Sequence, residues 1–215
     1  MAGIVLLSLL MSAKERILDE ALTLFAENGY DGTGVDLIAE RVGIKGPSLY
    51  KHFKGKEEIL NVLIDSAEAR YEEMFGSEKH IGKIPESREE FIKATMERIS
   101  FTLHDPMIRK MRMFLVQEQF RNERISEVTT KHQIDGVQRM FAKIIKGMMD
   151  KGVVIDDDPE LLAVELTAPA VLQIARSDRQ PQYEKECMEC IEKHLQHFCK
   201  VYMKQLKKRE KHKGH

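Results

Sequence analysis

A short basic segment carries the side chains whose types and spacing suit binding to an anionic partner. From Arg41 to Lys56 the chain has five Lys or Arg residues and no Asp or Glu. Tyr50 and His52 lie in the same segment and can donate hydrogen bonds to phosphate oxygens. The formal net charge of the whole chain is -1, which argues against a generally basic nucleic-acid binder. Because the positive charge is concentrated in one segment, it predicts a local docking face for nucleic acid.

The sequence offers no complete catalytic constellation. Ser48 and Lys51 match the S-x-x-K spacing of penicillin-interacting enzymes, but the companion K-T-G and S-D-N motifs are missing. The glycines between Gly29 and Gly34 have the wrong order for a dinucleotide fingerprint, and Gly55-Lys56 lacks the upstream glycine of a phosphate loop. We therefore predict that the chain is not an enzyme and uses no cofactor.

A second group of chemically capable residues lies near the C-terminus. Cys187, Cys190, His194 and His197 recur near one face of a predicted helix. This pattern suits a metal or thiol site, but it extends over about 15 Å of helix, so one ion could bind only a neighbouring pair such as Cys190 and His194. A complete site would need the same pair from a partner chain. We favour ordinary packing and predict no metal site, which leaves metal or redox sensing by this stripe open.

Two short helical patterns separated by a tight turn position the basic segment. The first helix is indicated by apolar residues at helical spacing, namely Val35, Ile38, Ala39 and Val42. Gly43 breaks this pattern, and a second helix starts near Pro47, which suits a first helical turn. On that second helix Leu49 and Phe53 share the face that points inward.

The outer face of the second helix is polar. Pro47, Ser48 and Lys51 point outward, while Tyr50 and His52 lie on the flanks, where they would meet the sugar-phosphate walls of a groove. Two helices joined by a tight turn place the second helix in the major groove of DNA. The sequence therefore predicts a helix-turn-helix.

These residues resemble the N-terminal domain of the TetR family of one-component bacterial regulators, over roughly Ser12 to Leu63. The residues that carry the resemblance are Gly29-Tyr30, Thr33, Ile38-Ala39, Val42-Gly43, Leu49-Tyr50, His52-Phe53 and Lys56-Glu57. The joint spacing of so many positions is far more specific than a single short motif.

The resemblance implies which residues meet DNA. It implies that residues of the second helix lie in the major groove or touch phosphates, that Lys56 clamps the backbone, and that Thr33 helps to anchor the first of the two helices. With the charge pattern, the expected DNA-binding set is Thr33, Lys45, Gly46, Pro47, Ser48, Tyr50, Lys51, His52 and Lys56. Gly34 and Lys45 depart from the family, because they stand where a Ser or Thr cap worth about 1 kcal/mol is usual.

The length and composition predict an all-α chain with two domains. At 215 residues and 42% hydrophobic content, the natural division is a three-helix helix-turn-helix domain over residues 11-56 and a helical ligand-binding and dimerisation domain over residues 57-215. We expect about nine helices. Lys56 opens one that runs to about Phe75, a loop follows to Pro85, and a long helix begins at Asn122 and ends near Gly152.

Further helix starts are predicted at a Ser87 capping box, at Asp105-Pro106 and at Asp158-Pro159. The segment Leu161 to Ala175 is nearly apolar around its circumference and contains Pro169, so we expect it to be deeply buried and kinked.

The last two helices are expected to form a homodimer interface, as the resemblance implies. A two-fold dimer would read a palindromic operator with its heads about 34–36 Å apart. A small-molecule effector is expected in the helical domain, where flexible thioethers and aromatic rings suit an adaptable apolar pocket. The candidate ligand-binding residues are Met96, Phe101, Met107, Met111, Phe114, Glu118, Met140 and Glu165. Each of them also suits plain core packing, and the two acids would favour a cationic ligand only if they face a cavity.

The predicted function is a ligand-responsive transcription regulator, most simply a repressor released by an apolar or amphipathic effector. An activator of the same fold, or a dimeric small-molecule-binding protein with impaired operator binding, stays open. Three cysteines fit a reducing cytoplasm, and the sequence has neither a clear leader nor a stretch of about 20 apolar residues that could span a membrane. We interpret Met1 to Leu10 as an upstream start-site extension.

Overall fold

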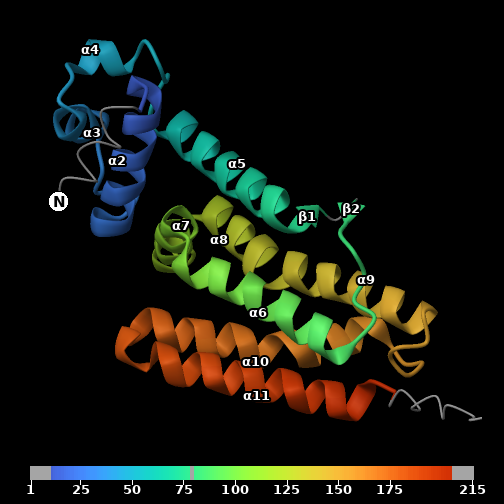
Figure 1. Cartoon of the computed structure of the whole chain (residues 1–215). Helices are drawn as coiled ribbons and strands as arrows, with labels where there is room; N and C mark the ends of the chain where they lie inside the picture. The colour runs from blue at the N-terminus through green and yellow to red at the C-terminus, as the bar shows by residue number, and fades with distance from the viewer. Residues whose placement is uncertain (1–10, 78–79, 205–215) are drawn as a thin grey trace, which may run out of the picture. The chain divides into compact units, whose positions relative to one another are not determined.

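The computed structural model describes residues 11–77 and 80–204, and these residues are almost entirely helical (Figure 1). The α-helices are α2 (Ala13–Asn28), α3 (Val35–Val42), α4 (Gly46–Leu49), α5 (Lys56–Phe75), α6 (Arg88–His104), α7 (Pro106–Glu118), α8 (Glu123–Thr130), α9 (Gly136–Asp150), α10 (Pro159–Arg179) and α11 (Glu184–Tyr202). Two strands of two residues each, β1 (Gly76–Ser77) and β2 (His80–Ile81), lie in the expected loop. A short 3-10 helix, η2 (Pro181–Tyr183), precedes α11. The predicted all-α class is confirmed. The expectation for residues 1–10 lies outside the described residues.

One continuous helical run takes the place of the single long helix expected after Asn122. It consists of α8, the π-helix η1 (Lys131–Asp135) and α9. Counted as one helix, this run gives the nine helices expected for the described part of the chain. A π-segment widens the helix locally, and such segments often lie at functional or hinge positions.

Capping side chains explain where several helices begin. Ser12 and Glu15 form a reciprocal capping box at the start of α2. Asp105, Asn122 and Asp158 each accept hydrogen bonds from backbone N–H groups in the first turn of the helix that follows them. The helix starts predicted at these positions are confirmed.

The cap of α6 differs from the prediction. The Ser87 hydroxyl accepts a hydrogen bond from the Glu90 N–H at 3.1 Å, as a capping box requires. The Glu90 carboxylate, however, accepts the N–H of Glu86 at 2.9 Å and the ammonium of Lys83, also at 2.9 Å. The reciprocal half of the box is therefore replaced by contacts with the segment before the helix.

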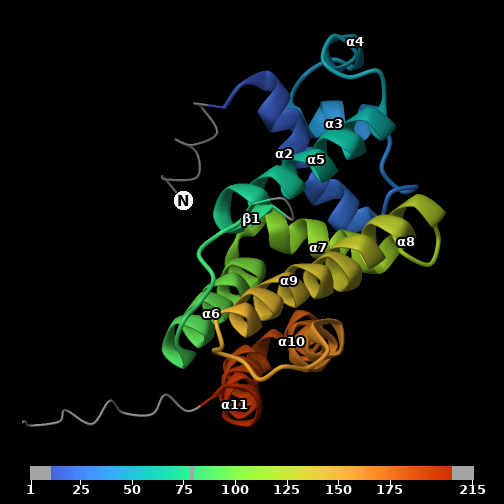
Figure 2. The same ribbon diagram turned by 90° about the vertical axis from the view of Figure 1, so that its right-hand side faces the viewer.

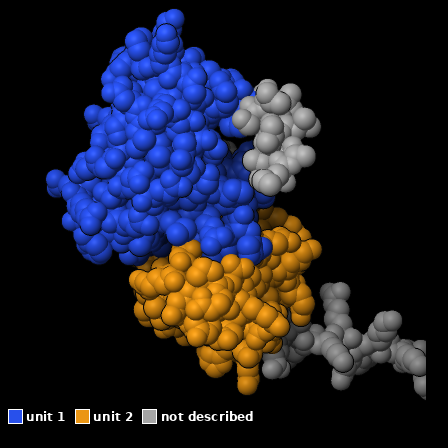
Figure 3. All heavy atoms as spheres, turned by 90° about the vertical axis from the view of Figure 1, so that its left-hand side faces the viewer, with its two compact units in different colours: residues 1–79, 99–135 blue, residues 80–98, 136–215 orange. Residues whose placement is uncertain are grey.

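The chain folds into two compact units, which Figure 3 colours separately. Unit 1 extends to residue 79 and resumes over residues 99–135, and unit 2 contains residues 80–98 and the chain from residue 136 onward. Helices α2 to α5, α7 and α8 therefore belong to unit 1, and α9 to α11 belong to unit 2. These units are defined by compactness. The expected division between residues 56 and 57 separates a DNA-binding domain from a ligand-binding domain, and it stays a prediction.

Helix α2 lies at the centre of unit 1 and packs against α3, α5 and α7 (Figure 2). Its residues Ile17, Ala21 and Phe25 are fully buried. The ring of Phe25 lies 5.4 Å from the ring of Phe114 on α7, centroid to centroid. Burial of each such large apolar side chain contributes about 1.5–3 kcal/mol. The head, which we define as α2 to α4 (Ala13–Leu49), thus shares one hydrophobic core with α7.

In unit 2, α10 packs against α9 on one side and α11 on the other. Phe91, on the first part of α6, stacks on Phe198 of α11 with ring centroids 6.3 Å apart. The chain after α9 returns along the end of α11, where Val154 and Met203 form an antiparallel bridge. Both contacts lie at the C-terminal end of α11 and hold that end against the rest of unit 2.

Helix α10 is buried on one face only, which corrects the expectation of deep burial around its circumference. Leu162 and Leu166 are buried, whereas Leu161 is 53% exposed and Leu172 is 63% exposed. Pro169 does lie inside the helix, as expected. A sequence that is apolar all round can bury its second face only against another chain or leave it in water. Among the described residues no helix, α10 included, has both the length and the apolar character needed to cross a membrane.

Candidate nucleic-acid interface

A left-handed glycine makes the tight turn between α3 and α4. Gly43 has φ 76° and ψ 32°, a conformation that favours glycine. Its N–H donates to the carbonyl of Glu40 at 3.0 Å, and the Ile44 N–H donates to the carbonyl of Ala39 at 2.9 Å. These bonds satisfy the last carbonyls of α3. The chain can therefore leave α3 abruptly and begin α4 at Gly46.

The second helix of the predicted pair is present but shorter than expected. It ends at Leu49, and the chain continues in turns in which His52 and Phe53 donate their N–H groups to the Leu49 carbonyl at 2.8 and 3.1 Å. Leu49 is fully buried and Phe53 is 2% exposed, so the inward direction predicted for both side chains is confirmed. These two side chains anchor α4 and the turn after it in the hydrophobic core of the head.

Neither helix of the pair has a side-chain cap. Gly34, which precedes α3, has no side chain to act as a cap, and the side chain of Lys45, which precedes α4, makes no capping hydrogen bond. This agrees with the expected departure at both positions. Because a cap contributes about 1 kcal/mol, the start of α4 depends more heavily on the burial of Leu49.

The outer surface of α4 and of the turn after it is exposed and basic, at the outer edge of unit 1 (Figure 1). Its exposed residues are Lys45, Pro47, Tyr50, Lys51, His52 and Lys54. Tyr50 is 56% exposed. Within the described part of the chain, the ammonium groups of Lys45, Lys51 and Lys54 have no acidic partner. Free cations beside an exposed aromatic suit contacts with phosphates and base edges.

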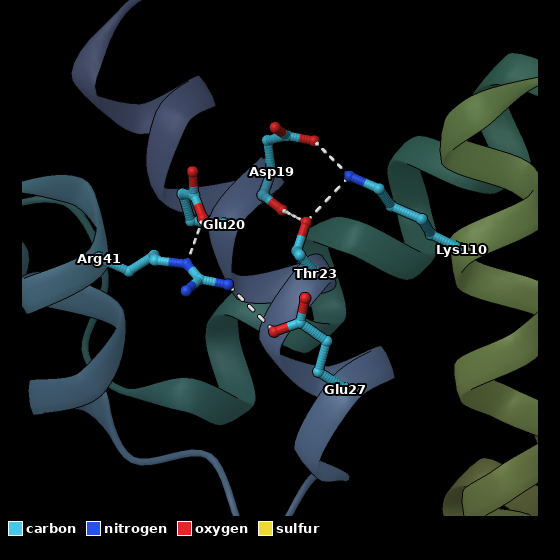
Figure 4. Close-up of polar contacts among 6 residues, drawn as sticks. All are labelled: Asp19, Glu20, Thr23, Glu27, Arg41 and Lys110. Atoms are coloured by element: carbon cyan, nitrogen blue, oxygen red, sulfur yellow. Dashed lines mark hydrogen bonds and ion pairs between the residues drawn. The ribbon is translucent and has the colours of Figure 1, made fainter.

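Arg41 does not belong to this surface, although it lies in the same basic segment of the sequence. Its Nε donates to Glu20 at 3.2 Å, and its Nη2 donates to Glu27 at 3.0 Å (Figure 4). Both carboxylates lie on α2, so the guanidinium joins α3 to α2 instead of facing a ligand. The positive surface is therefore narrower than the sequence suggested and consists of lysines.

Thr33 is fully buried and so cannot touch DNA. Its hydroxyl lies 3.1 Å from the Leu24 carbonyl and 2.9 Å from the Gly29 carbonyl, both of them acceptors at the end of α2. This position fits the anchoring part of the expectation. Its place in the interface is indirect, because it holds the loop that leads into α3.

Lys56 also has an internal partner. Its ammonium donates to the Tyr30 carbonyl at 2.8 Å and lies 4.3 Å from the centroid of the Tyr30 ring. Burial raises the pKa of the Tyr30 hydroxyl, and the carboxylate of Glu57 adds to the rise. Lys56 thus joins the first turn of α5 to the loop after α2, at the base of the head.

The candidate ligand-binding residues do not form one group. In unit 1, Phe114 is fully buried and Met111 is nearly so, while Phe101 and Met107 pack against the same core. Met96, Met140 and Glu165 belong to unit 2. A shared pocket for all of them stays a prediction.

The two candidate acids have protein partners. Glu118 is buried, its Oε1 lies 3.7 Å from Arg121, and a Cβ placed on Gly29 would lie 2.6 Å from that oxygen. Glu165 is exposed and accepts a hydrogen bond from the Tyr202 hydroxyl at 2.5 Å. In this structure Glu118 therefore supports the contact between α7 and the end of α2.

Two surface hollows lie in unit 2. The larger, about 640 Å³, is lined by Leu172, Gln173, Arg176, Arg179 and Gln180 on the last turns of α10. The smaller, about 360 Å³, lies between α9 and the start of α10. Neither is lined by a candidate ligand-binding residue.

An aromatic cluster in unit 1 was not predicted from the sequence. The ring of Phe101 lies 5.5 Å from Tyr71 and 5.1 Å from Phe75, both on α5. The Tyr71 hydroxyl donates to Thr102 at 3.1 Å, and burial raises the pKa of Tyr71. The spacing of Tyr71 and Phe75, one helical turn apart, was the available signal.

The cysteine and histidine stripe of α11 is divided between two environments. Cys187 is buried whereas Cys190 is exposed, and His194 makes a 3.1 Å hydrogen bond through Nε2 with the Leu166 carbonyl. Burial raises the pKa of Cys199, the third cysteine, to about 11, so this thiol stays protonated at neutral pH. Within residues 11–77 and 80–204, no three potential ligands are grouped closely enough to hold a metal ion.

The sequence of the head matches a known family model. Residues 17–63 match the model described as bacterial regulatory proteins, tetR family. Over 125 residues the chain is 35% identical to IcaR of Staphylococcus epidermidis, a negative transcriptional regulator of the biofilm operon icaADBC, and the match covers 45% of this chain and 68% of IcaR. With IcaR of Staphylococcus aureus the identity is 56% over 46 residues, or 21% of this chain and 25% of that protein.

The whole fold is similar to solved structures. One is SmeT, the repressor of the Stenotrophomonas maltophilia multidrug efflux pump SmeDEF. The SmeT–triclosan complex superposes with a TM-score of 0.71 at 19% sequence identity, covering 91% of this chain and 93% of SmeT. At that level of identity the similarity shows the shared fold.

Proposed function

Because this chain belongs to the TetR family of bacterial regulatory proteins, we propose that it acts as a homodimeric repressor that binds a palindromic operator and is released by a small apolar or amphipathic effector. The observation that carries the proposal is the exposed, basic surface of α4, seated on the buried side chains of Leu49 and Phe53. Bacterial DNA lies in the cytoplasm, so the proposed location is cytoplasmic.

In the proposed complex α4 enters the major groove. Gly46, Pro47, Ser48 and Lys51 would meet base edges, where a well-placed side chain discriminates between bases by about 1–3 kcal/mol. The exposed side chains Tyr50, His52 and Lys45 would contact the phosphates that flank the groove. Such contacts fix the register of the protein and make its affinity depend on salt.

Helices α10 and α11 supply the proposed dimer surface. The exposed apolar residues Leu161, Val164 and Leu172 recur at helical spacing on α10, and Val201 is exposed on α11. An apolar band of this kind is unfavourable in water and favours association with a second copy. A two-fold axis through these helices would present two heads to the two halves of a palindrome.

The effector would act by preferring a state in which the heads do not fit the operator. A coupling free energy of about 1–3 kcal/mol would weaken operator affinity about 5–150-fold. The candidate pocket residues and the aromatic cluster of Tyr71, Phe75 and Phe101 favour an apolar or amphipathic compound. Triclosan, the compound in the SmeT complex, is one to test here.

Selection of binding sites from a pool of random duplexes tests the proposal. The purified protein is expected to enrich a palindromic sequence. Tyr50→Ala should weaken binding to it about 30-fold, since the dimer loses two contacts of about 1 kcal/mol each. Phe120→Ala, which removes an exposed aromatic of unit 1 outside the α4 surface, is the matched control and should bind as the unaltered protein does.

The same selection separates the alternatives. If low salt yields no enriched sequence, the repressor proposal fails and the dimeric small-molecule-binding protein is favoured. The absence of side-chain caps at Gly34 and Lys45 is the feature that favours that alternative. Activation and repression differ in operator position, so a reporter with the selected sequence placed upstream or within a promoter distinguishes them.

The salt dependence of binding should separate Lys45 from Lys56. The free ammonium of Lys45 is available to phosphates, so Lys45→Ala should lower the slope of log affinity against log salt by about two, one for each head of the dimer. The ammonium of Lys56 is held by the Tyr30 carbonyl, so Lys56→Ala should weaken binding to all sequences while the slope stays that of the unaltered protein. A slope lowered by about two in Lys56→Ala would instead show that this ammonium moves to a phosphate in each head.

A further inference from the structure

Helix α7 holds α2 through a polar contact that no motif in the sequence announced. The ammonium of Lys110 lies 2.9 Å from the Thr23 hydroxyl and 3.3 Å from the Asp19 carboxylate (Figure 4). The Thr23 hydroxyl itself donates to the Asp19 carbonyl at 2.9 Å. The ammonium therefore has two acceptors on consecutive turns of α2, which fix its position along the helix better than a single ion pair would.

This contact is the first of three that follow one another along both helices. Next to it Phe25 stacks on Phe114 with centroids 5.4 Å apart, and at the end of α2 the carboxylate of Glu118 approaches Gly29. Lys110, Phe114 and Glu118 recur every four residues on α7, so they share one face. These three contacts on one face set the register between α2 and α7. The hydrogen bonds of Lys110 are directional, and the stacked rings of Phe25 and Phe114 pack closely.

The opposite connection of α2 leads to the DNA-binding surface. Arg41 of α3 bridges Glu20 and Glu27, which lie on α2 about two turns apart. Figure 4 shows α2 between Arg41 of α3 and Lys110 of α7. A change in the angle between α2 and α7 is therefore passed to α3, and with it to the exposed surface of α4.

We propose that Lys110 is a positioning residue which, through Asp19 and Thr23, fixes the orientation of the head and thereby sets the operator half-site spacing that the dimer accepts. The proposal rests on the proposed function, because spacing has meaning only for two heads on one duplex. Half-sites lie about 10–10.5 base pairs apart, or a multiple of this, when two heads read the same side of DNA. A head with freer orientation reaches neighbouring spacings as well.

The exposure of the contact indicates what it can and cannot do. The side chains of Lys110 and Asp19 are 38% and 57% exposed, and an ion pair so open to solvent adds little to stability. The buried rings of Phe25 and Phe114 keep the helices together without it. Loss of Lys110 should therefore leave the fold intact and alter orientation.

The test uses a duplex library in which two copies of the selected half-site are separated by spacers of stepwise length. Lys110→Met keeps the unbranched shape and most of the length of the side chain and removes its charge. We expect the affinity for the best spacing to fall by no more than about fivefold per head, and the ratio of affinities between the best and neighbouring spacings to fall toward one. The salt slope should not change, because the ammonium faces α2 and not DNA.

Control variants separate orientation from general damage. Lys110→Arg keeps a charged donor and should retain the spacing preference. Lys93→Met removes a lysine whose ammonium lies 4.0 Å from Glu97 in unit 2 and should behave as the unaltered protein does. Exchange of the pair, Asp19→Lys with Lys110→Asp, should restore part of the preference that Lys110→Met loses.

Two outcomes would overturn the inference. The first is a spacing profile of Lys110→Met that matches the unaltered protein, and the second is a salt slope lowered by about two, one for each head, which would make Lys110 a phosphate contact. A failure of the proposed function looks different, since the unaltered protein would then select no half-site at all.

Discussion

Replacement of Gly29 by alanine is expected to lower the free energy of unfolding by about 3 kcal/mol, because the residue has a backbone conformation that is essentially restricted to glycine. Gly29 follows α2 with φ 76° and ψ 170°. A Cβ at this position would also lie 2.6 Å from the Glu118 carboxylate. Equilibrium urea unfolding of the purified protein measures the change, and we expect the transition of unit 1 to move to lower urea.

Gly82→Ala is the matched control for this substitution. Gly82 is exposed, lies in a loop of unit 2, and has no atom within 4 Å of the position of an added Cβ. Alanine there should be neutral or stabilising by up to about 1 kcal/mol, since it only restricts the unfolded chain. If Gly29→Ala unfolds at the same urea concentration as Gly82→Ala, neither the backbone conformation of Gly29 nor the close approach of Glu118 is a constraint of the folded protein.

The local features of the head could be predicted from its sequence. The apolar spacing around Ile38 and Ala39, the break at Gly43 and the inward direction of Leu49 depend on neighbours within a few residues. The structure confirms each of them. Caps are equally local, which is why the helix starts at Asp105 and Asp158 were found. Patterns of this kind depend on interactions that are local in the sequence.

The partners of the charged residues could not be predicted. Arg41 and Lys56 have the same charge as Lys51, yet Arg41 is bound by two carboxylates of α2 and Lys56 by the Tyr30 carbonyl. Those partners lie between 14 and 26 residues away in sequence. Which cation is free therefore depends on how the helices pack. A count of charges along the sequence does not distinguish free cations from paired ones.

The candidate ligand residues show a similar limit. Methionines and aromatics at helical spacing predict an apolar face, but Met111 and Phe114 turn that face toward the head. The same composition would suit the lining of a cavity. Only the arrangement of neighbouring helices distinguishes these two environments, and the sequence does not contain it in any local pattern.

The sequence overestimated the burial of α10, because a single chain does not contain everything that can cover an apolar helix. An apolar helix face looks the same in sequence whether the same chain or another copy covers it. Leu161 and Leu172 are exposed in the single chain. The apolar pattern that predicts their burial is therefore not satisfied by contacts within one copy. In the proposed dimer these side chains meet the partner.

The double substitution Leu161→Glu with Leu172→Glu should convert the dimer to a monomer. Each unpaired carboxylate placed in a closed interface costs about 3 kcal/mol or more, so the dissociation constant of the dimer should rise by at least about a thousandfold. Both positions face solvent in the single chain, so its helical content should not change. Sedimentation velocity over a concentration series measures the dissociation.

Operator binding should weaken with the loss of the dimer, because linking two heads increases affinity by about 100- to 10,000-fold over one head. The double variant should therefore bind the full palindrome no more tightly than a single half-site. Phe120→Glu is the matched control, since Phe120 is 91% exposed in unit 1 and lies on neither α10 nor α11. If the double variant remains a dimer and the control dissociates, the interface lies on unit 1, and the apolar face of α10 needs another partner.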